Sequence, residues 1–556
     1  MNDESVKPVG TVVGVSSTTE FQMQVRPDAV RTQDLVAVDT IEDGVTYRVW
    51  AKVGQIERLN PLFPREAAQE LAFQGRDPID SVVSMSKEMI TATCTVVGVL
   101  RDGRLEPPKY PVQPAIRVYV PPADEVEALL VGETPVHRRL FLGTERGNQD
   151  VNVYVDGHMV LSRHLAILAS TGAGKTVAAR RIIDELRDKG YPVLIFDPHG
   201  DYERLVPKDS SEVVSYVPDI QLASESIDQV ISYIAGLSGE EITPPQASLI
   251  AALMTVLSDP ALVMQMNSAL DEQGLMPLTE TLERNHFHAL SAAAAVIQEL
   301  KAADDRAPLP RAISSLAAGL NVGTATANAV RRQTGAASKQ YSGMRKMNRT
   351  RLGEAIPLPI GENIRTIIKQ RQVARVVLEG YSEALRQSLV ASIMQELLAA
   401  RVDGAVPRFV TVIEEAHNFI PGWTAGGSDV QAPSLPVIKQ VATEGRKYGM
   451  GLIFISQRPS RIDATVLSQA NSYLVLRIVN PNDQRYIRDV VETMGESEAA
   501  ALPNLNTGEA LLSGMFTRIP VMVRIERSLS EGKHEEEDFL GYVRAGDSGA
   551  MMAAEE

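Results

Sequence analysis

The stretch HLAILASTGAGKTVAARRI, residues 164–182, constrains this 556-residue chain more than any other feature. An apolar run enters a turn of small residues, meets Lys175 and Thr176, and continues as a helical pattern. Residues 169–176 match the phosphate-loop pattern G-x-x-x-x-G-K-[ST], except that Ala169 replaces the first glycine. Because such a loop joins a buried strand to a helix, the stretch predicts an α/β nucleotide-binding fold.

Each part of this loop has a physical role in binding a nucleotide. Backbone N–H groups of the turn point at phosphate oxygens, and Gly172 and Gly174 allow backbone angles that a side chain would forbid. Lys175 supplies a cation for the terminal phosphates, and the Thr176 hydroxyl can bind Mg²⁺. We therefore expect ATP and Mg²⁺ as cofactors; the alternative is a glycine-rich helix start without a ligand. The predicted nucleotide contacts are Ser170, Thr171, Gly172, Ala173, Gly174, Lys175, Thr176 and Val177.

Hydrolysis needs a further acid, and the segment RFVTVIEEAHNFIP supplies two of them. The apolar or small residues 410–413 run into Glu414 and Glu415. Consecutive residues at a strand end point in different directions, so one carboxylate can reach the Mg²⁺ shell while the next faces the attacking water. We predict that Glu414 binds the metal, directly or through water, and that Glu415 polarises the water. The alternative is a pair of solvated acids after a buried strand.

Three further polar residues are candidates for the catalytic step. Gln457 follows the apolar strand of GLIFISQRPS and is predicted to sense the γ-phosphate. Arg446 and Arg163 could neutralise charge on the transferred phosphoryl group. Arg163 lies too close in sequence to the loop to fold back onto its own γ-phosphate, so we expect it to project onto a neighbouring subunit. Either arginine could instead form an ordinary surface ion pair.

The segment LIFDPHGDY is a further concentration of polar residues after an apolar strand. Asp197 ends the strand, and His199 and Asp201 follow closely. A zinc cluster is disfavoured because no other His or Cys lies near in sequence. We expect the segment to line the nucleotide site or a subunit edge.

The remaining sequence falls into regions of different pattern. Residues 8 to about 125 read as short, β-branched strands, which indicates a small barrel or a sandwich. From about residue 140, strands alternate with helices, which predicts a mostly parallel sheet covered on both faces. An Ala-, Leu-, Met- and Gln-rich stretch, roughly 222–350, predicts a helical insertion. The predicted domains are an N-terminal β domain (1–139), an ATPase core (140–526) and a polar C-terminal tail (527–556).

Composition limits the setting in which the chain works. The single cysteine, Cys94, permits no disulfide framework within the chain, so we expect a reducing, cytoplasmic environment. Because the first residues are polar, we expect no signal peptide there, and we find no apolar run long enough to span a bilayer. The net charge of −15 argues against a surface coated in basic residues, although a local basic channel is compatible with it.

Positive charge gathers between Asp305 and Glu354, a span without an acidic residue. Its centre mixes Gly, Ser and Tyr341 with the basic residues, which suits a mobile loop that tracks DNA phosphates. The alternative is a basic helix that pairs with acids elsewhere. Residues 420–436, which have no positive charge, could form a second, moving pore loop or a plain connector. The candidate DNA contacts are Lys339, Arg345, Lys346, Arg349 and Arg351.

Four segments, in this order, resemble the HerA family, the hexameric ATPases of the HerA–FtsK group of DNA translocases: LSRHLAILASTGAGKT, LIFDPHGDY, FVTVIEEAH and EGRKYGMGLIFISQRPS. The resemblance implies an N-terminal β-barrel, a RecA-like ATPase core interrupted by a helical subdomain, and a C-terminal extension that braces a neighbour. It also implies a cis-acting arginine at Arg446 and an intersubunit arginine at Arg163. The chain departs from the family pattern at Ala169 and at Asp201, where a glutamate is usual.

The resemblance further implies a homohexameric, ATP-dependent double-stranded DNA translocase or helicase. Such a motor acts with a partner, either a NurA-like nuclease in DNA end processing or an anti-phage defence effector such as a nuclease or a sirtuin-type NADase. The alternative is an ATP-switched scaffold that assembles and regulates an effector enzyme. The sequence predicts no nuclease activity of its own and no membrane partner.

Overall fold

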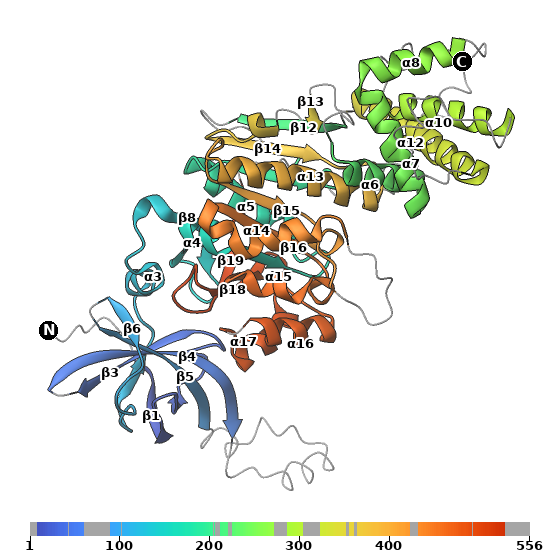
Figure 1. Cartoon of the computed structure of the whole chain (residues 1–556). Coiled ribbons are helices and arrows are strands. Elements are labelled where there is room, and N and C mark those ends of the chain that lie inside the picture. The colour runs from blue at the N-terminus through green and yellow to red at the C-terminus, as the bar shows by residue number, and fades with distance from the viewer. Residues whose placement is uncertain are drawn as a thin grey trace, which may run out of the picture. The chain divides into compact units, whose positions relative to one another are not determined.

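The chain forms two compact units, each described here by itself (Figure 1). The first comprises Met1–Lys175 and Ile453–Glu526, and the second comprises Thr176–Leu452 and Arg527–Glu556. The predicted domain boundaries stay predictions, and most of the predicted tail lies outside the described residues. The computed structural model describes residues 8–42, 44–59, 89–101, 103–203, 205, 212–220, 225–271, 286–303, 323–351, 355–360, 364–422, 432–491 and 493–528.

The first unit begins with a closed β-barrel. The strands pair in the order β2-β1-β7-β3-β4-β5, and β5 pairs back onto β2, which closes the ring and decides between barrel and sandwich. In β2, alternate residues are buried, and Phe21 and Met23 join Val38, Val49 and Cys94 in the barrel core. The strands are β1 (Pro8–Ser16), β2 (Glu20–Val25), β3 (Leu35–Glu42), β4 (Val45–Leu59), β5 (Met89–Arg101), β6 (Arg104–Glu106), which pairs antiparallel with the end of β5, and β7 (Arg117–Tyr119).

The rest of the first unit is a mixed sheet in the order β16-β10-β17-β18-β19-β8-β9. Its pairings through β10 are parallel, and those from β17 to β9 are antiparallel. Its strands are β8 (Arg139–Glu145), β9 (Asn152–Asp156), β10 (Leu165–Leu168), the end of β16 (Met450–Ser456), β17 (Ser472–Val475), β18 (Glu509–Gly514) and β19 (Val521–Ile525). Its helices are α3 (Ala123–Val131), α4 (Gly157–Arg163), α15 (Ala464–Gln469), α16 (Pro481–Val490) and α17 (Glu496–Ala501).

The second unit holds the parallel strands that the sequence predicts, in the order β13-β12-β14-β11-β15. Every residue of β11, β14 and β15 is buried, as expected for parallel strands covered on both faces. The strands are β11 (Val193–Asp197), β12 (Glu212–Ile220), β13 (Ile356–Ile360), β14 (Gln372–Val377) and β15 (Phe409–Ile413). The helices of this sheet are α5 (Lys175–Asp188), α13 (Glu383–Val402) and α14 (Leu435–Tyr448).

The predicted helical insertion is confirmed, and it includes the basic span. The expectation of a mobile loop there is wrong, because residues 324–351 form one continuous helix, α12. The sequence carries the reason: Ala327, Val330, Thr334, Ala337, Tyr341 and Met344 recur at helical spacing and are buried. The insertion helices are α6 (Ile227–Ser238), α7 (Pro244–Ser258), α8 (Pro260–Asp271), α10 (His286–Ala303) and α12 (Thr324–Arg351). No helix within the described ranges is long and apolar enough to cross a membrane.

Candidate nucleotide site

The phosphate loop follows the fully buried strand β10. Leu168, the last residue of that strand, lies opposite Ser456 of β16 and Val475 of β17. The turn needs its two glycines because φ is +74° at Gly172 and +97° at Gly174. Ala169 is not among the described residues with positive φ, so the alanine replaces the usual glycine without backbone strain.

A segment that the sequence did not single out contacts this loop. The Gly508 N–H donates to the Ala173 carbonyl at 3.1 Å, and the Thr507 hydroxyl donates to the Gly172 carbonyl at 3.4 Å. A Cβ atom on Gly174 would lie 3.1 Å from the Gly508 nitrogen, so both the positive φ and the close approach require glycine there. The only local signal for this contact is the turn-forming Thr-Gly pair before β18.

Gln457 lies beside the loop, as its predicted role requires. The Thr171 hydroxyl donates to Gln457 Oε1 at 2.6 Å, across 286 residues of sequence. Lys175 is buried at the start of α5. Arg163 is half-buried at the end of α4, where its carbonyl accepts a hydrogen bond from the Asn471 N–H at 2.9 Å.

The two predicted acids follow β15 in the second unit. Glu414 is fully buried and Glu415 is 6% exposed, so neither is the solvated acid of the alternative interpretation. Phe196 of β11 lies opposite Ile413 of β15, and therefore the residues that follow, Asp197 and Glu414, emerge at the same end of two neighbouring parallel strands.

Glu415 has a conformation that is costly for a side chain of its size. Its backbone is left-handed, with φ +50° and ψ +49°, and it precedes the short 3₁₀ turn Ala416–Asn418. Its Oε2 atom lies 3.3 Å from Nδ1 of His417. Strained, buried non-glycine residues of this kind gather at functional sites, which supports a role for Glu415 beyond packing.

The DPHGDY turn surrounds the carboxylate of Asp197 with donors. This side chain is fully buried and accepts hydrogen bonds from the N–H groups of His199, Gly200, Asp201 and Tyr202 at 2.8–3.3 Å. Burial raises the pKa of Asp197, while Arg375 at 3.2 Å and the backbone N–H donors oppose that rise.

Arg446 is not brought to the acids of its own unit. It is exposed in the last turn of α14, and Gly449 just beyond it accepts a hydrogen bond from Phe409, the first residue of β15. Glu414 follows the last residue of the same strand. With about 3.3 Å of rise per strand residue, the two ends of β15 lie roughly 15 Å apart.

The donor set fits a hard divalent cation. Thr176 offers a hydroxyl at the start of α5, and Glu414 offers a carboxylate, while Glu415 beside it is left for the water. Mg²⁺ prefers oxygen ligands and is usually held by one or two carboxylates together with the phosphates of its nucleotide. Thr176 and Glu414 would hold Mg²⁺. The last of the predicted nucleotide contacts, Val177, follows Thr176 in the first turn of α5.

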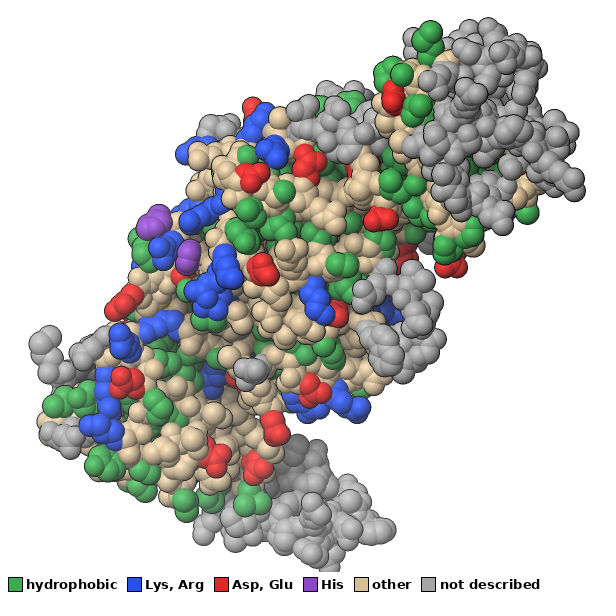
Figure 2. Space-filling view, viewed as in Figure 1, with side chains coloured by type: hydrophobic (Ala, Val, Ile, Leu, Met, Phe, Trp, Pro, Cys, Tyr) green, Lys and Arg blue, Asp and Glu red, His purple; other side chains and the backbone are tan. Residues whose placement is uncertain are grey.

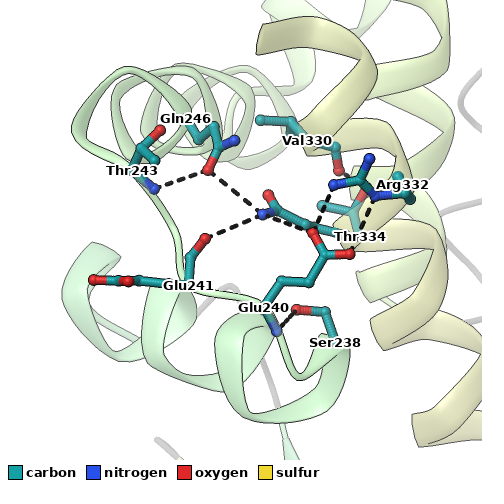
Figure 3. A network of polar contacts seen from close by, with 9 residues as sticks. Ser238, Glu240, Glu241, Thr243, Gln246, Val330, Arg332 and Thr334 are labelled. Carbon is teal, nitrogen blue, oxygen red and sulfur yellow. Dashed lines mark hydrogen bonds and ion pairs between the residues drawn. The ribbon is translucent and has the colours of Figure 1, made fainter. Parts of the chain in front are cut away.

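The candidate DNA contacts lie on the second half of α12. In its first half, two arginine side chains bond to other residues of the insertion. Figure 3 shows Arg332 donating to both carboxylate oxygens of Glu240, at 3.1 and 2.7 Å. Arg331 donates to Gln298 at 2.6 Å. Lys339 and Lys346 are exposed. The side chains of Arg345, Arg349 and Arg351, and most of the second candidate loop (423–431), lie outside the described residues.

Charge on the visible face is mixed. Figure 2 shows Lys and Arg side chains interspersed with Asp and Glu, with no single basic patch among the side chains coloured there. This distribution agrees with the net charge of −15.

Comparison with known proteins identifies relatives along most of the chain. The DNA double-strand break repair helicase HerA of Pyrococcus furiosus is 26% identical over 533 residues, which cover 93% of this chain and 92% of that protein. The probable DNA double-strand break repair helicase HerA of Methanocaldococcus jannaschii is 26% identical over 82% of this chain and 89% of that protein. Among solved structures, VirB4 of Thermoanaerobacter pseudethanolicus matches with a TM-score of 0.41 and 16% identity, over 70% of this chain and 96% of that chain.

Two family models match in succession. The model of the central domain of helicase HerA matches residues 140–397, and the HerA-like C-terminal model matches residues 323–528. Together they take in the phosphate loop, the DPHGDY turn, both acids and Gln457. The chain therefore belongs to the HerA family of helicases.

Proposed function

We propose that this protein is the motor subunit of a homohexameric, ATP-dependent double-stranded DNA translocase. The observation that carries the proposal is the pair of buried, oriented acids after β15, in a HerA-family chain whose phosphate loop is hydrogen-bonded to Gln457. In the proposed reaction the loop and Lys175 bind the phosphates of Mg·ATP. Glu415 then polarises the attacking water, and Gln457 responds to the γ-phosphate.

The first test is ATP hydrolysis by the purified protein with and without linear duplex DNA. We expect strong stimulation by duplex DNA and loss of activity in Lys175→Ala, because that variant lacks the cation for the terminal phosphates. Stimulation of wild type alone supports the motor and justifies a translocation assay. Hydrolysis that is indifferent to DNA, or that persists in Lys175→Ala, contradicts the proposal.

The two arginines are proposed to neutralise phosphoryl charge, and mixed rings separate their modes of action. Arg163→Ala and Arg446→Ala are each mixed with Lys175→Ala subunits. If the arginine acts on a neighbour's nucleotide, mixed rings should regain activity. The arginine variant then keeps an intact phosphate loop, and the neighbouring Lys175→Ala subunit supplies the missing arginine to it. Arg446 lies near the end of β15 opposite to Glu414, because Gly449 bonds to Phe409; this favours complementation for Arg446 too, against the cis-acting role that the resemblance implies. Absence of complementation contradicts an intersubunit role.

The partner is proposed to be a nuclease or another effector. Relatives in the family carry names that place them in DNA double-strand break repair, which favours a NurA-like nuclease in end processing. A defence effector, either a nuclease or a sirtuin-type NADase, is the other proposed class. Affinity purification of the chain from its native host, followed by nuclease and NADase assays of the complex, distinguishes a nuclease partner from an NADase partner.

One observation favours a second function, the ATP-switched scaffold. Arg331 and Arg332 of the basic span bond to Gln298 and Glu240 within the insertion, so these two side chains are not committed to DNA. Charge reversal at Lys339 is the discriminating change. Reduced DNA-stimulated hydrolysis in Lys339→Glu, with effector assembly intact, supports the motor, whereas unchanged hydrolysis favours the scaffold.

A further inference from the structure

The DPHGDY turn makes contacts that the proposed reaction does not yet use. Tyr202, its last residue, is fully buried, and its hydroxyl donates to Glu414 Oε2 at 2.8 Å across 212 residues of sequence. We propose that Tyr202 is a positioning residue that fixes the carboxylate of Glu414 for the magnesium ion of the nucleotide site. The inference rests on the proposed function, since it assigns a role within the same site.

The position of Tyr202 is itself fixed by a hydrogen bond of its backbone N–H. Its N–H donates to Asp197 Oδ2 at 3.2 Å, while the three preceding N–H groups donate to the other oxygen of that carboxylate. Arg375 of β14 lies 3.2 Å from Oδ2. One buried carboxylate therefore organises the whole turn and directs the tyrosine side chain at the end of the neighbouring strand.

The turn is also joined to α5, the helix that follows the phosphate loop. Arg180 of α5 donates to the backbone carbonyl of Asp201. Both bonds made by Asp201 here, to Asp197 and to Arg180, use its backbone. The shorter side chain at this position therefore leaves the arrangement intact, which explains why aspartate can stand where the family usually has glutamate.

The physical consequence is an oriented carboxylate. A buried glutamate with three rotatable bonds would otherwise sample several rotamers, and ordering it on metal binding would cost conformational entropy. A hydrogen bond from a buried hydroxyl selects one rotamer in advance. Partners of this kind around a metal ligand typically change metal affinity or activity by 10–100-fold when they are removed.

The test compares Tyr202→Phe with a matched control, Tyr216→Phe. Tyr216 is a buried tyrosine of β12 whose hydroxyl accepts from Gln372 at 3.2 Å and contacts neither acid. Binding of a fluorescent, non-hydrolysable ATP analogue is titrated with Mg²⁺, alongside kcat and KM for ATP and the midpoint of thermal unfolding. We expect Tyr202→Phe to raise the Mg²⁺ concentration for half-maximal binding about 10-fold and to lower kcat about 10-fold, because Glu414 loses its fixed orientation. KM at saturating Mg²⁺ should change by less than about 3-fold, because the phosphate loop is untouched.

A double-mutant cycle separates positioning from general loss of structure. Because Tyr202 acts through Glu414, adding Tyr202→Phe to Glu414→Gln should leave the Mg²⁺ dependence unchanged. Equal Mg²⁺ titrations for Tyr202→Phe and Tyr216→Phe, or an additive effect in the double variant, would overturn the inference. Failure of the proposed function is distinguishable, since wild type would then bind the nucleotide analogue without hydrolysing ATP, and the Mg²⁺ titration of binding still decides the role of Tyr202.

Discussion

Two groups of buried carboxylates differ in how their charge is compensated. In the second unit, Asp197 and Glu414 end neighbouring parallel strands and accept bonds from backbone N–H groups, an arginine and a tyrosine. In the first unit, Glu145 of β8 and Glu498 of α17 share the neighbourhood of one buried lysine, Lys52 of β4.

The group in the first unit is only partly compensated. Lys52 lies 3.0 Å from Glu498, and both side chains are about nine-tenths buried. Burial lowers the pKa of Lys52 despite this partner. Burial also raises the pKa of Glu145 to about 7, although the Asn148 N–H donates to it at 2.6 Å and Lys52 opposes the rise.

The comparison teaches what donor number does to a buried acid. Asp197, with four N–H donors and an arginine, is fixed in place and organises a functional turn. Glu145, with fewer donors, changes its protonation near neutral pH. The Asp197 group is therefore suited to positioning a functional side chain. The Lys52 group is suited to a packing role in which the stability of the fold depends on pH.

The largest expected effect is on hydrolysis. Glu415→Gln keeps the size of the side chain but removes the group that polarises water, so kcat should fall about 10³-fold. Binding of the nucleotide should stay within a few-fold of wild type. Glu383→Gln, at an exposed position on α13, is the control and should retain activity. Normal turnover by Glu415→Gln would remove this residue from the reaction.

The next effect is on the stability that the Asp197–Arg375 pair gives to the second unit. Asp197→Asn leaves Arg375 buried without its opposite charge, so the free energy of unfolding should fall by about 3–5 kcal/mol. Asp403→Asn breaks an exposed pair with Arg365 at 3.9 Å and should cost less than about 1 kcal/mol. Denaturant unfolding measures both. A small loss for Asp197→Asn would mean that the turn does not depend on this carboxylate.

A pH dependence should distinguish the partly compensated group. The pKa of Glu145 is about 7 in the folded chain against a usual value of 4.5, so the folded state binds the proton more tightly. The contribution of Glu145 to the free energy of unfolding is complete below pH about 4.5 and is lost as the pH rises through 7. The free energy of unfolding should fall by about 3 kcal/mol over this range.

Glu145→Gln checks this expectation, because an uncharged side chain has no such proton to lose. Between pH 5 and 8, the free energy of unfolding of the variant should depend less steeply on pH than that of wild type. Glu20→Gln, at an exposed position on β2, should keep the wild-type slope. Parallel curves for wild type and Glu145→Gln would exclude Glu145 as the titrating group.

The smallest effect should come from replacing a whole ion pair by apolar residues. Lys52→Met with Glu498→Leu should change the free energy of unfolding by only about 1 kcal/mol, because one desolvated pair is exchanged for packing. The matching exchange in the other group, Asp197→Leu with Arg375→Met, should lose far more, because four backbone N–H groups lose their acceptor. Equal losses in the two doubles would contradict the comparison.

Local sequence patterns are sufficient to predict a structural feature that one contiguous segment forms. The phosphate loop is predictable because a buried strand, a glycine turn and a helix start follow one another within a dozen residues. Buried parallel strands, the acids after β15 and the helical insertion are likewise readable. The Gly, Ser and Arg content of the basic span hides the helical spacing of Ala327, Val330 and Tyr341, so the local pattern favours a loop where the structure has a helix.

The sequence by itself determined the family, the nucleotide loop and the identity of the acids, because these depend on residues that are neighbours in the chain. Only the tertiary structure decided that the β domain closes as a barrel through β2 and β5, that Thr171 meets Gln457, and that Tyr202 meets Glu414. Those contacts join residues between 67 and 286 positions apart in the sequence. Their geometry depends on how strands are ordered in a sheet, and no local spacing specifies that order.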